Sequence, residues 1–264
     1  MEKRSKRTGG TPDGGATNNR SLKSGNSLID WIRLGNSGVD LTGVSGRPRL
    51  VSPAELKKHN TKSSEYVRSY TPLTWDCDPR MDHATQLQLA VKRYDNGILS
   101  PVLSSLSTGD VLKVSGPYGN FQLHKLKTIK TIYLLAAGTG ITPMLGLIKF
   151  LLAKSNPACE SIYLLFFNKT EKDIMFQELL ESLANTDNRF YVVHILSNAS
   201  SVWTGRKGRI NATLLSEIMD EGDMFGNEDS RFAVICGPKE FTFASLNVLR
   251  CLGMEECFIH VFVG

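Results

Sequence analysis

The stretch Tyr133-Leu-Leu-Ala-Ala-Gly-Thr-Gly-Ile-Thr-Pro-Met144 decides the fold of this 264-residue chain. The apolar run 132–137 predicts a buried parallel strand that ends at two glycines, and a helix pattern follows from Thr142. Glycines let the backbone approach a pyrophosphate closely, and a helix N-terminus offers free N–H donors. A phosphate-binding turn is therefore predicted here, with a tight turn that binds nothing as the alternative. The residues expected to hold the phosphates are Gly138, Thr139, Gly140, Thr142 and Pro143.

Strand and helix patterns alternate from Thr131 to the end of the chain. The strands are expected at 132–137, 161–167, 189–196, 231–236 and 257–262, and the helices at 142–153, 171–184, 211–219 and 239–252. Such alternation predicts an α/β fold with a five-stranded, doubly wound parallel sheet. Ligands of these sheets bind at the carboxyl ends of the strands. The residues expected at those ends are Gly138, Gly140, Asn168, Ser197, Cys236, Gly237 and Pro238.

Shorter strands precede this region and predict a different kind of unit. They are expected at 67–74, 87–94 and 111–115, with a short helix at 99–106. Such strands suit part of an antiparallel β-barrel. Arg68 and Tyr70 would point to one side of the first strand, and Pro72 would end its pairing. By itself, the segment 67–74 is equally well an edge strand without a ligand.

The N-terminal part is basic and poor in apolar residues. Residues 1–62 hold 12 Lys and Arg against 5 Asp and Glu, although the whole chain has a net charge of only +5. We expect a disordered, solvated tail over most of this part. Weak contact with an anionic membrane is the alternative, and nucleic-acid binding is disfavoured because no aromatic residues lie among the basic ones. The amphipathic piece 27–34 could lie on a partner surface, whereas His59 lacks a second histidine that would support a haem-ligand role.

The sequence indicates a cytoplasmic setting. No run approaches the ~18 apolar residues of a membrane span, and the first 25 residues contain no apolar segment typical of a secretory signal. The five cysteines are scattered without a Cys-x-x-Cys pair, which favours reduced thiols and gives no reason to expect a metal centre.

Three motifs together resemble the cytochrome b5 reductase family of ferredoxin reductase-like flavoproteins. They are Arg68-Ser-Tyr-Thr-Pro72, Gly138-Thr-Gly-Ile-Thr-Pro143 and Cys236-Gly-Pro238, and Phe167-Asn-Lys-Thr-Glu-Lys-Asp-Ile174 adds a fourth likeness. The resemblance covers about residues 66–264. It implies hydride transfer from NADH or NADPH to FAD, followed by single-electron transfer to a haem protein such as cytochrome b5 or cytochrome c. It also implies a partial FAD-binding barrel at 66–127, an NAD(P)H-binding domain at 128–264 and an association with the endoplasmic reticulum.

Pieces of the region 1–65 resemble the start of the cytochrome b5 domain in the fused flavohaem members of the family, isoform four. These pieces are 27–34, 40–43 and 55–60. The haem-ligating His-Pro-Gly-Gly segment, the middle domain and the early barrel strands do not follow them, so we expect a shortened form without a haem domain. An incomplete barrel leaves unpaired strand edges. A second hypothesis is therefore a flavin-free nucleotide-binding or regulatory protein.

The resemblance assigns the flavin-side residues. Arg68 would neutralise the flavin pyrophosphate through paired donors, Tyr70 would pack on the isoalloxazine, and Thr71 would hydrogen-bond near the reactive nitrogen. Pro72 completes this motif, and a tyrosine of a core strand is the alternative for Tyr70. The family's Gly-Lys-Met-Ser phosphate turn corresponds to Gly97-Ile-Leu-Ser100, which keeps Gly97 and Ser100 but lacks the lysine.

The resemblance also assigns the nicotinamide side. Cys236 would lie against the nicotinamide ring, with a buried structural cysteine as the alternative, and Phe262 would pack near the flavin. Thr71 and Cys236 are thus the expected catalytic residues. NADH-selective members carry an Asp where this chain has Ser197, and Arg206 and Lys207 follow soon after. We therefore expect NADPH to be accepted as well as NADH.

Overall fold

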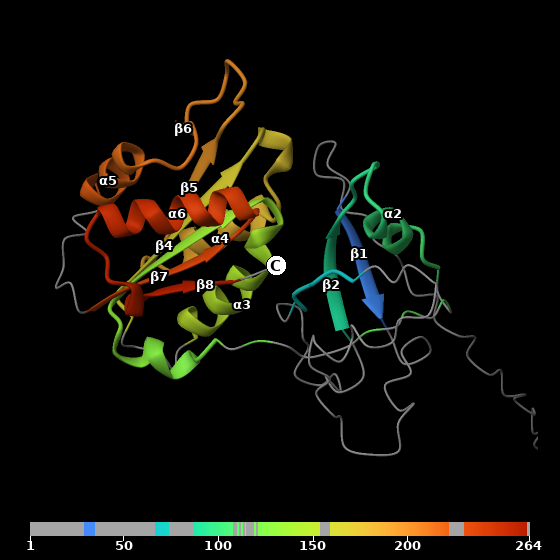
Figure 1. The fold of residues 1–264 in the computed structure, drawn as a ribbon, viewed down its shortest axis with the longest axis horizontal. Coiled ribbons are helices and arrows are strands. Elements are labelled where there is room, and N and C mark those ends of the chain that lie inside the picture. The colour runs from blue at the N-terminus through green and yellow to red at the C-terminus, as the bar shows by residue number, and fades with distance from the viewer. Residues whose placement is uncertain are drawn as a thin grey trace, which may run out of the picture.

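The computed structural model describes residues 29–34, 67–73, 87–107, 110, 112, 114, 119, 121–153, 159–221 and 230–262. These residues form two units (Figure 1). One is a parallel sheet with its covering helices, and the other is a pair of antiparallel strands with a short helix. Most of the predicted tail, including His59, lies outside the described residues, so its predicted disorder stays a prediction.

The larger unit contains six strands rather than the five predicted. They are β3 Thr131–Ala137, β4 Ser161–Asn168, β5 Phe190–Leu196, β6 Arg206–Lys207, β7 Arg231–Cys236 and β8 Ile259–Val261. All neighbours pair in parallel in the order β6-β5-β4-β3-β7-β8. The chain therefore runs outward from β3 to β6, then returns to the other side of β3. This reversal places the topological switch point between β3 and β7.

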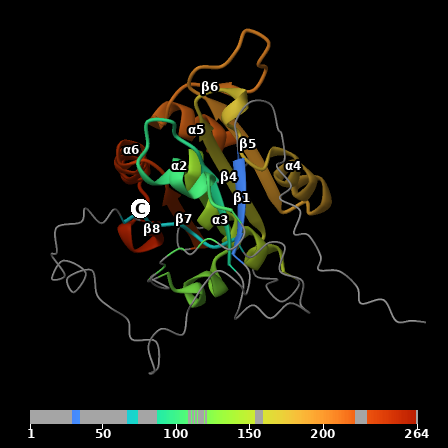
Figure 2. The same ribbon diagram turned by 90° about the vertical axis from the view of Figure 1, so that its right-hand side faces the viewer.

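Helices cover both faces of this sheet, as predicted for a doubly wound fold (Figure 2). They are α3 Ile141–Leu152, α4 Gln177–Thr186, α5 Ala212–Glu221 and α6 Lys239–Cys251. Alternate residues of β3 divide between two cores. Leu134 packs in the core with α3 and α4, whereas Leu135 packs in the core with α5 and α6. β3 is thus buried on both faces, which explains its unbroken apolar sequence.

Two predicted boundaries differ from the structure. The helix expected at 171–184 begins only at Gln177, because Thr170 and Asp173 form a reciprocal capping box around a separate 3₁₀ turn, η3 Glu171–Asp173. Phe176 then takes a left-handed conformation with φ 59°, which separates η3 from α4. The last strand is shorter than 257–262, since another 3₁₀ turn, η5 Glu256–Phe258, precedes it.

The smaller unit is built around β2 Leu87–Lys92, which pairs with β1 Ile29–Leu34. The short helix α2 Leu99–Ser104 packs on it, and η1 Leu123–Thr128 leads from this part of the chain towards β3. The amphipathic piece 27–34 thus contributes a strand. The expected strand at 67–74 was wrong over 67–73, where Pro72 makes a single bridge to Leu89 instead of ending a ladder.

Part of the third barrel strand lies outside the described residues. Leu112 and Val114, the described members of 111–115, are not in a strand. The structure therefore describes two antiparallel strands of this unit, and the partial barrel stays a prediction.

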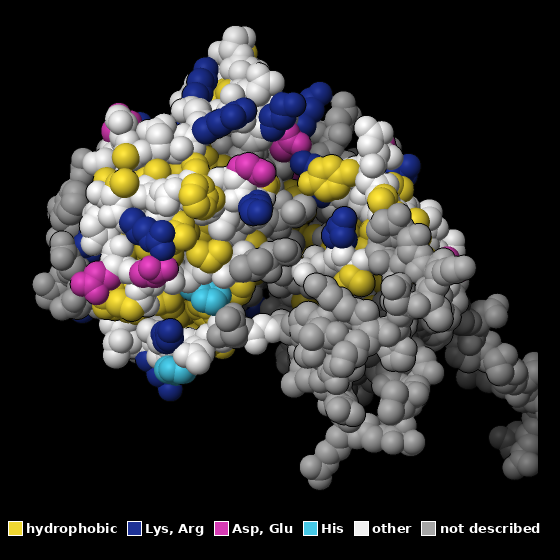
Figure 3. Space-filling model, viewed as in Figure 1, with side chains coloured by type: hydrophobic (Ala, Val, Ile, Leu, Met, Phe, Trp, Pro, Cys, Tyr) yellow, Lys and Arg dark blue, Asp and Glu magenta, His cyan; other side chains and the backbone are white. Residues whose placement is uncertain are grey.

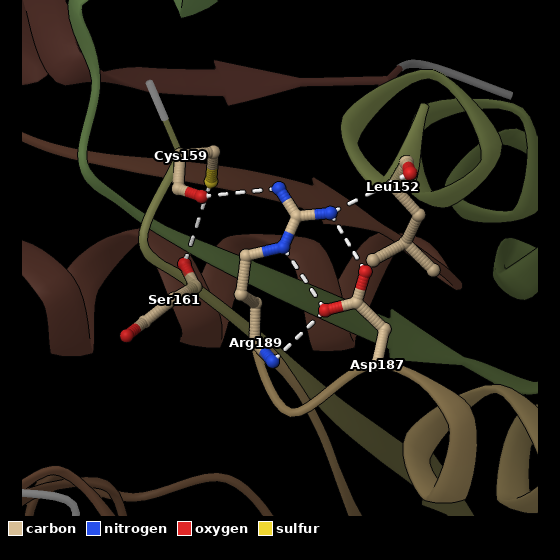
Figure 4. Close-up of polar contacts among 5 residues, drawn as sticks. All are labelled: Leu152, Cys159, Ser161, Asp187 and Arg189. Atoms are coloured by element: carbon tan, nitrogen blue, oxygen red, sulfur yellow. Dashed lines mark hydrogen bonds and ion pairs between the residues drawn. The ribbon is translucent and has the colours of Figure 1, made fainter. Parts of the chain in front are cut away.

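A polar network closes the amino edge of the parallel sheet (Figure 4). The Arg189 guanidinium donates to both carboxylate oxygens of Asp187, at 2.9 and 2.7 Å, and to the carbonyls of Cys159 and Leu152 at 3.4 and 3.5 Å. The Cys159 thiol donates to the carbonyl of Ser161 at 3.6 Å, and burial raises the pKa of this thiol to about 11. The network ties the end of α3 to the starts of β4 and β5. Among the described residues, four cysteines are free thiols and no helix is long and apolar enough to cross a membrane.

Candidate functional site

The glycine turn lies at the carboxyl end of β3, as predicted. Gly138–Gly140 forms one 3₁₀ turn that continues directly into α3. Gly138 has φ +53°, a left-handed conformation that favours glycine. Within the turn, the Thr142 hydroxyl donates to the Thr139 carbonyl at 3.1 Å. The Ile141 N–H donates to the Gly138 carbonyl, and Pro143 has no N–H, so the anion donors available at this helix end come from the remaining residues of its first turn.

Gly140 brings this turn against the end of β7. A Cβ atom at Gly140 would lie 2.2 Å from the carbonyl oxygen of Cys236. Only glycine allows so close an approach, because the atom that it would strike belongs to the backbone. The two loops at the switch point are therefore one packed structure rather than two independent turns.

The segment Cys236-Gly237-Pro238 begins with the last residue of β7 and leads into α6. Gly237 is also closely packed, since a Cβ there would lie 2.7 Å from the Phe241 ring and 2.9 Å from Cβ of Ala137. Pro238 precedes the first residue of α6, and its carbonyl accepts from Thr242 N–H at 2.9 Å. Burial raises the pKa of the Cys236 thiol to about 11. Cys236 is thus a neutral thiol at neutral pH, suited to packing rather than to nucleophilic attack.

Asn168 ends β4 on the other side of β3. Its side chain is buried, yet neither its amide nitrogen nor its amide oxygen has a hydrogen-bond partner among the described residues. Its backbone carbonyl accepts from Ser197 N–H at 3.0 Å and from the Ser197 hydroxyl at 3.5 Å. A buried amide without hydrogen bonds is costly, and a bound water, ion or ligand can satisfy it. This observation fits a nucleotide at the strand ends.

Basic residues stand beside Ser197. In the pairing of β5 with β6, Lys207 lies next to Leu196, one residue before Ser197. The Trp203 indole N–H donates to the Arg206 carbonyl at 3.0 Å and holds this part of the loop, while the Arg206 guanidinium pairs with Glu217 at 3.4 Å. Figure 3 shows Lys and Arg side chains gathered over the end of the body where β6 lies. Basic side chains therefore lie near the end of β5, together with the carboxylates of Glu217 and Glu171.

The Arg68–Pro72 motif belongs to the smaller unit. Arg68 and Thr71 are exposed, and the Arg68 guanidinium donates to the neighbouring carbonyl of Val67 at 2.8 Å. Tyr70 is half-buried against the cluster of Leu89, Val91 and Leu103. Burial raises the pKa of its phenol, and the nearby Arg68 charge opposes this effect. Exposed donors beside a partly covered aromatic ring fit an anionic, planar ligand.

The turn at Gly97–Ser100 is closed by its own hydroxyl. Ser100 Oγ accepts from Tyr94 N–H at 3.1 Å and lies 3.5 Å from the Tyr94 carbonyl, while Gly97 N–H donates to that carbonyl at 2.8 Å. A Cβ at Gly97 would lie 2.9 Å from Ser100 Oγ and 3.0 Å from the Tyr94 carbonyl oxygen, so the tight turn favours glycine. The Ser100 hydroxyl is thus already bonded within the turn where the sequence suggested a phosphate contact.

Phe262 belongs to an aromatic cluster at the last strand. Its N–H donates to the Ile235 carbonyl at 2.9 Å, and its ring lies 4.8 Å from His260 and 5.5 Å from Phe121. Phe121 comes from the segment that connects the two units. The predicted position of Phe262 near a flavin stays a prediction.

One contact between the units was missed from the sequence. Lys92 of β2 and Asp173 of η3 form an ion pair at 2.7 Å. Asp173 lies within the Phe167–Ile174 stretch that carried the family likeness, but a pairing of residues 81 positions apart leaves no local pattern in the sequence. The structure therefore brings together the residues predicted at the carboxyl edge of the sheet, while the flavin-side residues lie on the other unit.

Comparison with known proteins identifies two domains in the same order. Residues 55–123 match the oxidoreductase FAD-binding domain model, and residues 134–245 match the oxidoreductase NAD-binding domain model. Cytochrome b5 reductase 4 of Rattus norvegicus is 36% identical over 213 residues, which are 78% of this chain and 40% of the relative. The chain thus spans less than half the length of that relative.

Two solved structures are similar as well. The CS-b5R domains of human Ncb5or in the NAD+ form are 34% identical, with a TM-score of 0.69 over 77% of this chain and 58% of that one. The cytochrome b5 reductase domain of Ulva prolifera nitrate reductase is 31% identical, with a TM-score of 0.58 over 67% of this chain and 72% of that one.

Proposed function

This chain belongs to the cytochrome b5 reductase family, and we propose that it is a flavoprotein that moves a hydride from NADH or NADPH to FAD and single electrons onward to a haem protein. The observation that carries this proposal is the contact of Gly140 with the Cys236 carbonyl. It joins the phosphate turn to the Cys-Gly-Pro loop at the switch point, where doubly wound folds bind dinucleotides. The match to an FAD-binding domain just before it supports a second cofactor.

In this proposal the coenzyme binds along the ends of β4, β3 and β7. The glycine turn and the first N–H groups of α3 bind the pyrophosphate, with Thr142 and Pro143 shaping that turn. The Asn168 amide supplies its unused donor and acceptor to the coenzyme. The neutral Cys236 thiol packs on the nicotinamide and orients it without competing for the hydride, and Gly237 and Pro238 hold the loop that carries this thiol.

The flavin side uses the exposed donors of the smaller unit. FAD supplies hydride acceptance and single-electron release when bound. We assign pyrophosphate binding to Arg68, ring packing to Tyr70 and Pro72, and a hydrogen bond at the ring to Thr71. Gly97 and Ser100 form the second turn, where backbone donors have to serve because the Ser100 hydroxyl closes the turn.

We further propose that NADPH is accepted as well as NADH. Ser197 removes the repulsion that an Asp would exert on a 2′-phosphate, and Lys207 lies next to the end of the same strand. Similar Michaelis constants for both coenzymes would support this proposal, and a strong preference for NADH would contradict it. Ser197→Asp should lower NADPH selectivity about tenfold, the effect of ~1.4 kcal/mol.

We propose that the electron acceptor is a haem protein such as cytochrome b5 or cytochrome c. The transfer would take place in the cytoplasm, at the surface of the endoplasmic reticulum. A basic N-terminal segment could meet an acidic acceptor or an anionic membrane surface. Electron transfer to such a partner should slow as salt is raised, because exposed charges are screened. The proposed domains are 66–127 for FAD and 128–264 for the coenzyme.

The visible absorption spectrum of the purified 264-residue chain tests the function. Flavin bands that bleach on addition of NADH support it, and Arg68→Gln should then lose FAD on dilution while NAD+ binding persists. A colourless chain that binds NAD+ would instead identify a flavin-free nucleotide-binding protein. That second candidate is favoured by the Ser100 hydroxyl, which is engaged within its turn, and by Ile98, which replaces the lysine of the family's phosphate turn.

A further inference from the structure

The two faces of strand β2 pack against different units of the molecule. Its alternate residues Leu89 and Val91 pack with Leu103 of α2. Ala90, on the opposite face, belongs with Leu73 to the core that contains β3 and α3. Side chains alternate along a strand, so Lys92 leaves β2 on the same side as Ala90. The last residue of β2 therefore reaches the nucleotide-binding unit.

Lys92 meets Asp173 there in a half-buried ion pair. The ammonium lies 2.7 Å from Oδ1 of Asp173, and the two side chains are 20% and 24% exposed. The other oxygen, Oδ2, accepts from the N–H and the hydroxyl of Thr170 at 3.1 and 2.7 Å. Burial by itself would raise the pKa of the Asp173 carboxyl, but hydrogen bonds from Lys92 and Thr170 bring it below its usual value. The Asp173 carboxylate thus accepts hydrogen bonds both from Thr170 at the start of its own turn and from Lys92 of the other unit.

The Lys92–Asp173 pair lies between the segments that carry the two proposed cofactor positions. Thr170 lies two residues after Asn168, at the end of β4, and the capping box fixes η3 to that strand end. On the other side, Lys92 lies two residues before Tyr94, whose N–H donates to Ser100. A shift of this ion pair would move β2 and its following turn relative to the strand ends of the sheet.

We propose that Lys92 and Asp173 form the joint that positions the flavin-side unit against the nucleotide-binding unit, and thereby set the rate of hydride transfer. Both are positioning residues, because neither is assigned a contact with a cofactor. The inference rests on the proposed function for its kinetic part. A displacement of ~1 Å between reacting groups can cost about a hundredfold in rate, so a weakened joint is expected to slow the transfer.

The kinetic test uses the whole chain with bound FAD and compares Lys92→Met, Asp173→Asn and the double variant. Asn keeps an acceptor oxygen for Thr170 but removes the charge that binds Lys92. Rapid mixing with NADH should show flavin bleaching slowed about tenfold in each single variant. The double variant should be no slower, because both changes remove one interaction. The NAD+ dissociation constant and the FAD content should stay within about twofold of the original chain.

The matched control is Lys172→Met. Lys172 is exposed and adjacent to Asp173 in η3. Its replacement by Met removes one positive charge, as Lys92→Met does, but leaves the Lys92–Asp173 ion pair in place. It should leave the bleaching rate unchanged. Unchanged rates in Lys92→Met and Asp173→Asn would overturn the proposal. So would additive effects, or a loss confined to coenzyme affinity with the maximal rate preserved.

Hydrogen exchange provides a readout that needs no flavin. Amides of residues 89–92 should exchange faster in Lys92→Met and in Asp173→Asn, but not in Lys172→Met. A colourless chain with this exchange pattern would refute the proposed function while keeping the joint. A flavin-loaded chain whose exchange and bleaching rates are both unaffected by the two variants would refute the joint while keeping the function.

Discussion

The amino and carboxyl edges of the parallel sheet differ in how their polar side chains are hydrogen-bonded. At the amino edge, Arg189 is bonded through its guanidinium to Asp187 and to two carbonyls, and the Cys159 thiol is bonded as well (Figure 4). At the carboxyl edge, the Asn168 amide has no partner among the described residues, and glycine replaces side chains at the closest contact. The Arg189–Asp187 network is thus bonded within the protein, whereas the Asn168 amide at the other edge is buried without a hydrogen bond to a described residue. We therefore expect substitutions at the amino edge to change mainly stability, and substitutions at the carboxyl edge to change mainly the binding proposed there.

Gly140→Ala should have the largest effect of these substitutions, because it should disrupt the packing of the two loops at the carboxyl edge of the sheet. The added Cβ would overlap the Cys236 carbonyl, and neither backbone can move without separating the two loops. We expect unfolding free energy to fall by about 3 kcal/mol, the upper end for overpacking, together with loss of coenzyme binding. Chemical denaturation and calorimetric titration with NAD+ measure the two losses.

Gly146→Ala is the matched control for that substitution. Gly146 is exposed on α3, and a Cβ there would meet nothing within 4 Å. This change should raise unfolding free energy by roughly 0.5–1 kcal/mol, because alanine is the better helix former. Equal tolerance of both alanines would show that the loops are not packed as described.

Arg189→Met should disrupt the polar network at the amino edge of the sheet. It removes a paired hydrogen bond to a carboxylate and leaves Asp187 half-buried without its partner, at a cost of about 2 kcal/mol in unfolding free energy. NAD+ affinity should not change, since the network lies at the other end of the strands. The exposed pair Lys130–Glu160 offers the comparison, because Glu160→Gln should cost less than about 0.5 kcal/mol. A loss of NAD+ affinity in Arg189→Met would mean that the two edges are coupled.

Asn168→Leu sharpens the comparison, because stability and binding should change in opposite directions. Replacing an unsatisfied buried amide with an apolar side chain of similar size should raise the unfolding free energy of the free chain by about 1 kcal/mol. NAD+ affinity should fall, since the amide is assigned to the coenzyme. Denaturation of the free chain and titration with NAD+ measure the two effects separately. A fall in stability would contradict the assignment, because the amide would then have a partner in the free protein.

A smaller pH effect is expected from His194, which lies midway along β5. Burial lowers the pKa of its imidazole, with only a modest opposing influence from Glu181. Its neutral form therefore stabilises the fold above the unfolded value of ~6.5, and this contribution is lost as pH falls towards the lowered folded pKa. Denaturation midpoints at several pH values should decline less steeply in His194→Leu. His260, whose pKa burial also lowers, should leave a residual slope in that variant.

The regular part of the fold could be predicted from the sequence because its signals are local. An unbroken apolar run ending in glycines predicted β3 and its turn, and alternation of strands and helices predicted the carboxyl edge. Asn168, Ser197 and Cys236 were placed there simply because each follows a strand. Chain order alone therefore brought them together.

The remainder depended on contacts without a local pattern. β6 contains only Arg206 and Lys207, so it is too short for any periodicity. The capping box of Thr170 and Asp173 holds 171–173 in a separate 3₁₀ turn, so the expected helix begins only at Gln177. The Lys92–Asp173 pair joins positions far apart in the chain, and the approach of Gly140 to Cys236 appears only once two loops are packed.

The position of β3 in the middle of the sheet has a consequence for synthesis of the chain. One edge of β3 pairs with β4, which follows soon after it, but the other pairs with β7, which begins at Arg231, about a hundred residues later. At roughly 5–20 residues per second, the ribosome needs about 5–20 s to supply that partner. Throughout this interval the largely apolar strand β3 lacks its partner on one edge, and an open edge is a template for intermolecular pairing. Until β7 is made, this edge of β3 is therefore a site where nascent chains can aggregate.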